Sequence, residues 1–329
     1  MLSIGRLTFA SPLVLAPMAG ITDLPFRLIN RQFGCGLAFT EMISASALSH
    51  KNKNTLRMLS ATPDDRPLGV QILGDNPEII KGALDIISGY NFDLIDLNAA
   101  CPVDKVASGG KGAGLLREPV KLQKLLREII RHTVLPVTVK IRSGWDETSV
   151  NAVEIALRAQ DAGVSGLFIH GRTKTQGYSG TVDYNIIRKV KESLKIPVVA
   201  SGDGLTPALV GKLFNETGCD GVAVARGALG NPWIFSETAE YLKSGEAPPC
   251  PDIHEIAQIM KKHLALNTAF HGEKTGILLF RKLFAWYVRG MSVKQLRSRA
   301  FRSCSYDDML RLICELQLLQ DKCHVPAPL

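Results

Sequence analysis

Several features that mark common protein classes are missing from this 329-residue sequence. Its seven cysteines include no C-x-x-C pair, so neither a zinc site nor a disulfide framework is indicated, and a reducing cytoplasm fits best. There is no G-x-G-x-x-G or P-loop motif, which argues against a Rossmann dinucleotide site and a nucleoside triphosphatase. Because no apolar run is long enough to span a bilayer, we expect no membrane partner.

Acidic residues are missing from one long stretch near the C-terminus. Between residues 274 and 306 there is no Asp or Glu, whereas eight Lys and Arg alternate with aromatics such as Phe284, Trp286 and Phe301. From Pro251 onward the sequence contains twelve Lys and Arg but only seven Asp and Glu, so this segment carries most of the net charge of +8. Such a pattern suits phosphate contact and base stacking. The alternative is an amphipathic bundle with a solvated basic face and the same aromatics in its core.

Short apolar strands alternate with amphipathic helices over the first three quarters of the chain. We predict eight strands, at Leu13–Pro17, Leu37–Glu41, Leu68–Leu73, Asp93–Asn98, Pro136–Arg142, Gly166–His170, Pro197–Ser201 and Gly221–Arg226. Helical patterns are clearest at Pro77–Ser88, Pro119–His132, Ser149–Ala162, Tyr184–Leu194 and Pro207–Thr217. Strands that are apolar throughout indicate a parallel sheet covered on its outer face. Their number and the chain length favour a (β/α)8 TIM barrel over an open sheet.

The composition changes at about residue 245. Ala247–Pro251 is proline-rich and reads as a linker, and the remainder is helical in pattern to about Gln320 without strand signals. We therefore predict a catalytic barrel over residues 1–245 and a small all-helical, basic domain over residues 246–329. The weakest barrel unit is the second, because Ile43–Met58 has mixed periodicity.

Polar side chains follow nearly every predicted strand, where a barrel carries its reaction site. Helix capping does not explain Lys140 or Arg226, whose positive charge is unfavourable at a helix N-terminus. Glycines flank Asp203 and follow Arg226 at the ends of strands seven and eight, where barrels commonly bind a phosphate. These turns and the guanidinium of Arg226 predict a phosphate site.

The stretch from Asp93 to Pro102 is the strongest candidate for the reaction centre. A buried strand ends in Asn98, and a thiol follows at Cys101. The glycine-rich segment Ser108–Gly114 comes next, and we interpret it as an irregular loop and a candidate lid over Cys101. The alternative for an isolated cysteine is a packed core residue.

In order along the chain, these motifs resemble those of the flavin-dependent tRNA-dihydrouridine synthases, nearest to the bacterial B-type branch. The matching stretches are residues 16–23 (APMAGITD), 70–74 (VQILG), 96–98 (DLN) with Cys101–Pro102, Lys105 with 112–116 (GAGLL), 139–145 (VKIRSGW), 169–173 (IHGRT), 202–204 (GDG) and 231–235 (NPWIF). They cover nearly all of the predicted barrel. The helical segment matches in place and length.

The resemblance implies FMN as cofactor, NADPH (or NADH) as electron donor and uridine in tRNA as substrate. It implies hydride transfer to C6 of uracil and proton transfer from Cys101 to C5; a free thiol is mostly protonated at neutral pH. Position by position, it assigns FMN contacts to Pro17, Met18, Ala19, Gln71, Lys140, His170, Ser201, Gly202, Asp203, Ala225 and Arg226. It assigns substrate contacts to Asn98, Arg142 and Arg172, and no metal.

Three residues depart from the usual family pattern: Ser201 replaces an Asn, and Ala225 and Ala100 each replace a Gly. They affect the expected FMN affinity and remove no catalytic group. Two other classes fit part of the pattern, namely a flavin reductase of rRNA or of a small pyrimidine or enoate, and a non-catalytic RNA-binding protein. The simplest expectation for the oligomeric state is a monomer.

Overall fold

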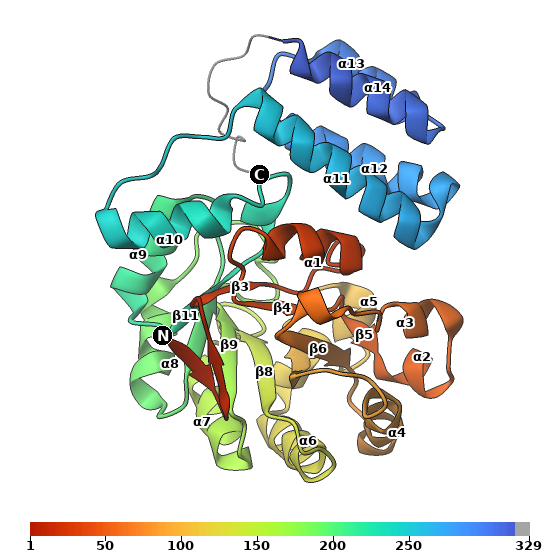
Figure 1. The fold of residues 1–329 in the computed structure, drawn as a ribbon. Coiled ribbons are helices and arrows are strands. Elements are labelled where there is room, and N and C mark those ends of the chain that lie inside the picture. Colours follow the sequence, from red (N-terminus) through yellow and green to blue (C-terminus); the bar gives the residue numbers. More distant parts are fainter. Residues whose placement is uncertain (320–329) are drawn as a thin grey trace.

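The computed structural model describes residues 1–319, so Cys323 and the end of the predicted 246–329 segment lie outside the described residues. Parallel strands form a closed barrel in the lower part of Figure 1, and helices α11 to α14 follow above it. The predicted TIM barrel followed by a helical segment is confirmed. Among the helices of residues 1–319, none is long and apolar enough to cross a membrane.

All eight predicted barrel strands are present, and each is buried along nearly its whole length. They are β3 (Leu13–Leu15), β4 (Leu37–Phe39), β6 (Leu68–Leu73), β7 (Leu94–Ala99), β8 (Val137–Arg142), β9 (Gly166–His170), β10 (Val198–Ser201) and β11 (Gly221–Val224). Neighbours pair in parallel in chain order, β11 pairs with β3, and β4 pairs with β6. In this register Asn98 lies opposite Lys140, and Arg142 lies opposite His170. The polar strand ends therefore meet at one mouth of the barrel.

Among the helices around the barrel, α1, α4, α8 and α9 begin at a side chain that caps the first turn. They are α1 (Leu24–Arg31), α4 (Pro77–Ile87), α6 (Pro119–Arg131), α7 (Ala152–Ala162), α8 (Tyr184–Ser193), α9 (Pro207–Thr217) and α10 (Ile234–Ser244). The side chain of Asn76 accepts hydrogen bonds from the first turn of α4, and Thr206 does the same for α9. Helix α7 begins three residues later than predicted, because the N–H groups of Asn151 and Ala152 donate to the Ser143 carbonyl.

The second barrel unit is irregular, as its mixed periodicity predicted. It contains the two-residue strand β5 (Ile43–Ser44), two short helices, α2 (Ala45–Ser49) and α3 (Lys53–Arg57), and the 3-10 turn η1 (Pro63–Asp65). The helices are separated by Lys51, whose φ of +52° lies outside the helical region. Asn52 then starts α3, because its side chain accepts hydrogen bonds from the next helical N–H groups.

A hairpin of β1 (Leu2–Ile4) and β2 (Leu7–Phe9), which the sequence analysis did not predict, closes the barrel at the end opposite the polar strand ends. Its turn residue Gly5 packs against Pro136 and Ser165, which directly precede strands β8 and β9. The apolar side chains of the hairpin join a cluster with Phe39 and Phe168 inside the barrel. Among the described residues, the barrel interior is thus covered at this end, and the C-terminal ends of the strands form the other mouth of the barrel.

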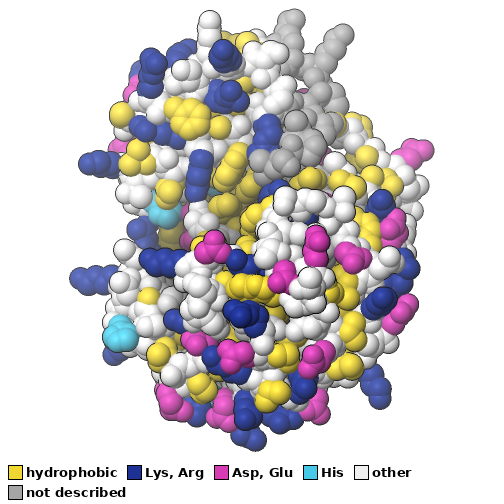
Figure 2. Space-filling view, turned by 180° about the vertical axis from the view of Figure 1, so that it is seen from behind, with side chains coloured by type: hydrophobic (Ala, Val, Ile, Leu, Met, Phe, Trp, Pro, Cys, Tyr) yellow, Lys and Arg dark blue, Asp and Glu magenta, His cyan; other side chains and the backbone are white. Residues whose placement is uncertain are grey.

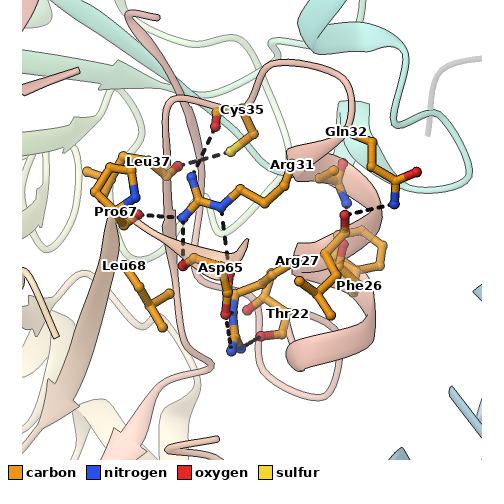
Figure 3. Close-up of polar contacts among 12 residues, drawn as sticks. Thr22, Phe26, Arg27, Arg31, Gln32, Cys35, Leu37, Asp65, Pro67 and Leu68 are labelled. Atoms are coloured by element: carbon orange, nitrogen blue, oxygen red, sulfur yellow. Dashed lines mark hydrogen bonds and ion pairs between the residues drawn. The ribbon is translucent and has the colours of Figure 1, made fainter. Parts of the chain in front are cut away.

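A buried ionic cluster fastens α1 to the loop before β6 (Figure 3). The guanidinium of Arg27 donates to a carboxylate oxygen of Asp65, with an Nη2 to Oδ2 distance of 2.7 Å, and to the Thr22 and Ser60 carbonyls. Arg31 donates to the Cys35 and Asp65 carbonyls, at 3.0 and 3.2 Å. Arg27 is 1% exposed and Asp65 is fully buried, so this cluster sets where α1 leaves the barrel.

Four further helices follow the barrel: α11 (Ile253–His271), α12 (Glu273–Tyr287), α13 (Lys294–Arg302) and α14 (Tyr306–Gln317). Helix α11 packs against α1, and the other three pack against α11 or against one another. Residues 247–252 form neither helix nor strand, and α11 begins with a capping box between Asp252 and Glu255. A Cβ on Gly230 would lie 2.3 Å from the Trp286 backbone carbonyl carbon, so barrel and helices touch backbone to backbone there. Most aromatics of the basic stretch, including Phe284, are buried in this segment.

Candidate functional site

A cavity of about 470 Å³ opens at the C-terminal ends of the barrel strands. Its wall contains every sequence-predicted site residue except Arg172: Pro17, Met18, Ala19, Gln71, Asn98, Cys101, Lys140, Arg142, His170, Ser201, Gly202, Asp203, Ala225 and Arg226. The lining combines apolar side chains, such as Met18 and Leu229, with the amides of Gln71 and Asn98 and with the cations Lys140, Arg142 and Arg226. A cavity of this volume and character is typical of a small-molecule or cofactor site.

A chain of hydrogen bonds leads from the barrel interior to Cys101. Buried Asp96 accepts from the Gln71 amide at 2.7 Å, and Gln71 in turn accepts from Asn98 Nδ2 at 2.8 Å. Asn98 Oδ1 accepts from the backbone N–H of Ala100 at 3.0 Å and of Cys101 at 2.8 Å. The predicted substrate residue Asn98 therefore lines the cavity, but its carbonyl oxygen already orients the segment that carries the thiol.

Asp96 is a polar residue of this site that the sequence analysis did not assign. Burial raises the pKa of its carboxyl to about 6, although hydrogen bonds from Gln71 and Thr138 and the nearby Lys140 oppose the shift. The sequence did carry a signal for Asp96, which is an acidic residue in the middle of an apolar strand. An unpaired buried carboxylate is energetically costly, so such a residue is expected to have polar partners. When ionised, Asp96 supplies a negative charge near the positive charge of Lys140.

Lys140 is a half-buried cation that lines the cavity. Its Nζ donates to Ser201 Oγ at 2.9 Å, and Ser201 donates onward to the Ile169 carbonyl at 3.2 Å. Burial lowers the pKa of the Lys140 ammonium to about 8, and Asp96 works against that decrease while Arg142 adds to it. A lysine held this way can be charged near neutral pH and can be deprotonated at moderately alkaline pH.

Arg142 lies at the edge of the cavity and holds two loops together. Its Nε donates to the Ala100 carbonyl at 2.8 Å, and its Nη1 donates to the carbonyls of Thr173 and Gly177 at 2.9 and 2.8 Å. Burial lowers the pKa of its guanidinium to about 10. The same side chain that the sequence analysis assigned to substrate thus also fixes the backbone beside Cys101.

The position of Arg172 differs from the sequence expectation. It does not line the cavity; it is 2% exposed, and its guanidinium pairs with Asp203 at 2.6 and 3.0 Å while donating to two backbone carbonyls. Arg226 also donates to Asp203, at 3.0 Å. The substrate contact that the family resemblance implied for Arg172 stays a prediction, and in this structure the guanidinium is engaged by the carboxylate of the next loop.

The turn after β10 needs unusual backbone angles. Gly202 has a φ of +119° and Asp203 a φ of +51°, and a Cβ on Gly202 would lie 2.8 Å from a ring carbon of His170. Burial, followed by the charges of Arg142 and Lys140, holds the pKa of His170 well below its usual value. A neutral imidazole therefore packs tightly under this turn.

Tyr178 is a cavity residue that the sequence analysis missed. It is 61% exposed on the loop after β9, and its ring lies 5.6 Å from the Arg142 guanidinium carbon and 5.3 Å from that of Arg226. The sequence signal for this residue was an aromatic side chain in the glycine- and serine-containing segment Gly177–Gly180. An exposed ring at the mouth of a cationic cavity is suited to stacking on a flat ligand.

The glycine-rich segment after Cys101 is more ordered than predicted. Residues Asp104–Ala107 form the short helix α5, and Gly112–Arg117 form the 3-10 helix η2. The Ala113 N–H donates to the Cys101 carbonyl at 3.1 Å, and a Cβ on Gly112 would lie 2.9 Å from that of Cys101. The prediction of an irregular loop is wrong for its second half, because these glycines permit close packing beneath the thiol.

Basic side chains gather on the helical segment and around the hollow between it and the barrel (Figure 2). On α13, Lys294, Arg297 and Arg302 are exposed, whereas Arg299 pairs with Glu315 at 2.6 Å. Phe301 lies on the same helix and is 49% exposed. A cationic surface with an exposed ring can contact a polyanion. Within residues 1–319 no group of three or more His, Cys, Asp and Glu is placed to hold a metal ion.

Three comparisons identify similar proteins. The model of the family described as "Dihydrouridine synthase (Dus)" matches residues 14–320. A probable tRNA-dihydrouridine synthase of Rickettsia conorii is 38% identical over 292 residues, covering 88% of each protein. The tRNA-dihydrouridine synthase B of Pseudomonas aeruginosa is 37% identical, covering 87% of this chain and 86% of that one. A structure of histamine dehydrogenase from Rhizobium sp. 4-9 has a TM-score of 0.59 at 12% identity, covering 96% of this chain and 63% of the other, and supports the fold alone.

Proposed function

Because this chain belongs to the dihydrouridine synthase family and has tRNA-dihydrouridine synthase activity, we propose that its barrel cavity holds FMN and that Cys101 protonates the uracil. The observation that carries the proposal is the arrangement of Cys101 beside Lys140 and Arg142 in one cavity with an apolar wall. NADPH would be the electron donor, as the family resemblance implies. We assign the catalytic role to residues 1–245 and tRNA binding to residues 246–329.

The residues of the cavity fit FMN in shape and in chemistry. Pro17, Met18 and Ala19 offer an apolar surface for a flat ring, and Gln71 and Lys140 offer hydrogen-bond donors beside it. The turns that follow β10 and β11 meet closely, because a Cβ on Gly227 would lie 2.2 Å from the Gly204 carbonyl oxygen. These turns and Arg226 would bind the phosphate. Asp203 would accept hydrogen bonds from the ribityl hydroxyls.

The departures from the family pattern are compatible with this cofactor. Ser201 takes the hydrogen bond of Lys140, so the serine keeps the ammonium oriented without an amide. Ala225 lines the cavity with only a methyl group. Each therefore changes the shape of the site slightly and removes no donor to the phosphate.

Bound in this cavity and reduced, FMN would supply the hydride chemistry needed at C6 of the uracil. Cys101 donates its thiol proton to C5, which completes the reduction of the C5–C6 bond. Lys140 stabilises the negative charge that develops on the uracil during this transfer. Asn98 and Arg142 contribute by fixing the peptide bond between Ala100 and Cys101, Asn98 through its N–H and Arg142 through its carbonyl. Arg172 contributes by holding Asp203 in place.

The uridine must leave its stack to reach the cavity, as for enzymes that act on a single base. Tyr178 is exposed at the mouth and would stack against the flipped base or its neighbour. The basic face of the helical segment would bind the tRNA backbone. Both contacts are sequence-independent, so the position of the reduced uridine follows from how the folded tRNA docks.

We expect tRNA binding to depend steeply on salt. Replacing Lys294 and Arg297 together by alanine removes two exposed cations from α13. The slope of log Kd against log salt concentration should then fall by about 1.4–1.8 in magnitude, because each lost phosphate contact contributes roughly 0.7–0.9. Fluorescence anisotropy over a salt series measures this slope. An unchanged slope would mean that this helix does not touch the tRNA.

The rate of FMN reduction by NADPH without tRNA should fall above pH 8. Lys140 has a pKa lowered to about 8, so it is charged below that pH and becomes neutral above it. Because the ammonium stabilises negative charge in the cavity, the rate should fall by about tenfold per pH unit on the alkaline side. A Lys140→Arg protein, which stays charged, should show a flat profile over pH 8–10. Stopped-flow absorbance distinguishes the two profiles.

A reoxidation experiment tests the function directly. The purified protein is reduced with NADPH without oxygen and mixed with tRNA that lacks dihydrouridine. Rapid return of the flavin absorbance with tRNA, but not with free uridine, is the expected result. A protein that binds no flavin would refute the cofactor assignment. A reducible flavin that tRNA does not reoxidise would refute the assignment of this cavity to uridine reduction.

A further inference from the structure

The loop between β3 and α1 forms one wall of the cavity through Pro17, Met18, Ala19 and Ile21. In the middle of this loop, both backbone groups of Gly20 are held by charged side chains. Its N–H donates to the Glu41 carboxylate from the barrel, and its carbonyl accepts from the Lys282 ammonium on α12. A residue of the helical segment therefore contacts the backbone of the cavity wall directly.

A second contact secures the end of the same loop. Asp23 caps α1 by accepting from the Phe26 N–H at 3.0 Å, and its other carboxylate oxygen lies 2.7 Å from Nε2 of His271 at the end of α11. The side chains of both Asp23 and His271 are less than a fifth exposed. The 17–23 loop is thus held by the helical segment at two points, Gly20 and Asp23.

The environment of these contacts favours strong electrostatics. Three of the residues that make them, Asp23, Glu41 and His271, line part of a second, smaller cavity of about 150 Å³ between the barrel and α11. Burial raises the pKa of Glu41, while the Gly20 N–H and the charge of Lys282 oppose that increase. Charges partly removed from water interact more strongly than charges at the surface. Lys282 and Glu41 can therefore fix Gly20 from opposite sides.

We propose that Lys282 and His271 are positioning residues for the cofactor wall, so that the helical segment helps to build the FMN site. This inference rests on the proposal that FMN lies against Pro17, Met18 and Ala19. The segment then has two roles, one toward tRNA and one toward the flavin.

The test measures flavin binding in the full-length protein without tRNA. Lys282→Met removes the donor to the Gly20 carbonyl, and we expect the Kd for FMN to rise about tenfold. The visible absorbance spectrum of the remaining bound flavin should shift, because the ring meets a displaced wall. Lys282→Arg keeps a cationic donor and should restore both the affinity and the spectrum.

Lys262→Met is the matched control. Lys262 on α11 also reaches the barrel, donating to the Gln32 side chain at 2.7 Å, but at the far end of α1 from the cavity loop. Wild-type FMN affinity in this variant would support a local role for Lys282. Equal loss of affinity in both variants would overturn the proposal, since general loosening of the helices would then explain it.

Two results separate this inference from the proposed function. If the wild-type protein binds FMN and Lys282→Met binds it equally tightly with an unchanged spectrum, the positioning role is overturned and the FMN site stands. If the wild-type protein binds no FMN, the proposed cofactor site fails, and the positioning role fails with it.

Discussion

Replacing Cys101 by alanine should lower the rate of dihydrouridine formation on tRNA by about 10²–10⁴-fold, the usual contribution of a positioned general acid. The substitution removes the thiol but keeps the backbone contacts, in which the Cys101 N–H donates to Asn98 and its carbonyl accepts from Ala113. FMN content and NADPH-dependent flavin reduction should stay at wild-type values. Single-turnover assays with unmodified tRNA, together with flavin absorbance, measure the two effects separately.

The control for this prediction is Cys314→Ala. Cys314 is an exposed thiol on α14, in the helical segment. Its removal should leave the rate of dihydrouridine formation unchanged. Normal turnover by the Cys101→Ala protein would refute the proton-donor role, and loss of flavin from that protein would instead show that Cys101 supports the cofactor site.

Replacing Asp65 by asparagine should lower the free energy of unfolding by about 3–5 kcal/mol. The carboxylate is fully buried, and the substitution leaves the Arg27 guanidinium, 1% exposed, without its countercharge. Neighbouring Arg31, whose Nε lies 3.6 Å from the same carboxylate, also loses its ionic partner. Because the cluster ties α1 to the loop before β6 (Figure 3), we expect a lower urea midpoint.

An exposed pair provides the comparison. Asp161 pairs with Arg127 at 2.6 Å, but the two side chains are 63% and 44% exposed. Asp161→Asn should change the free energy of unfolding by less than about 1 kcal/mol, because water and salt screen surface charges. Similar effects of Asp65→Asn and Asp161→Asn would mean that burial of the Arg27 pair contributes nothing to stability.

The barrel was predictable because its physical requirements are local. Strands of a parallel barrel are buried on both faces and appear as short apolar runs, and Asn76–Pro77 and Thr206–Pro207 mark helix starts by capping chemistry. The β1–β2 hairpin was missed because its apolar residues become buried only when it covers the barrel end. A sequence stretch of a few residues does not reveal such a long-range contact. The second unit was ambiguous because two short helices replace one.

Individual side-chain partners were the least predictable part of the site. An arginine at a strand end has the same sequence signal whether it faces a cavity or pairs with a carboxylate, and Arg172 does the latter with Asp203. Asp96 lies within a strand and Tyr178 within a loop, so neither stood at a strand end where functional groups were sought. Their roles depend on neighbours that are distant in the chain.

The amino-acid sequence by itself determined the fold class, the family and many of the side chains that line the cavity, because hydrophobic periodicity and motif order are properties of neighbouring residues. Only the tertiary structure decided how those side chains share their hydrogen bonds. It assigned Asn98 to the backbone beside Cys101, and it joined Lys282 to Gly20 across 262 residues. Such contacts form only when the barrel closes and the helices pack against it, since burial and pairing depend on the whole fold.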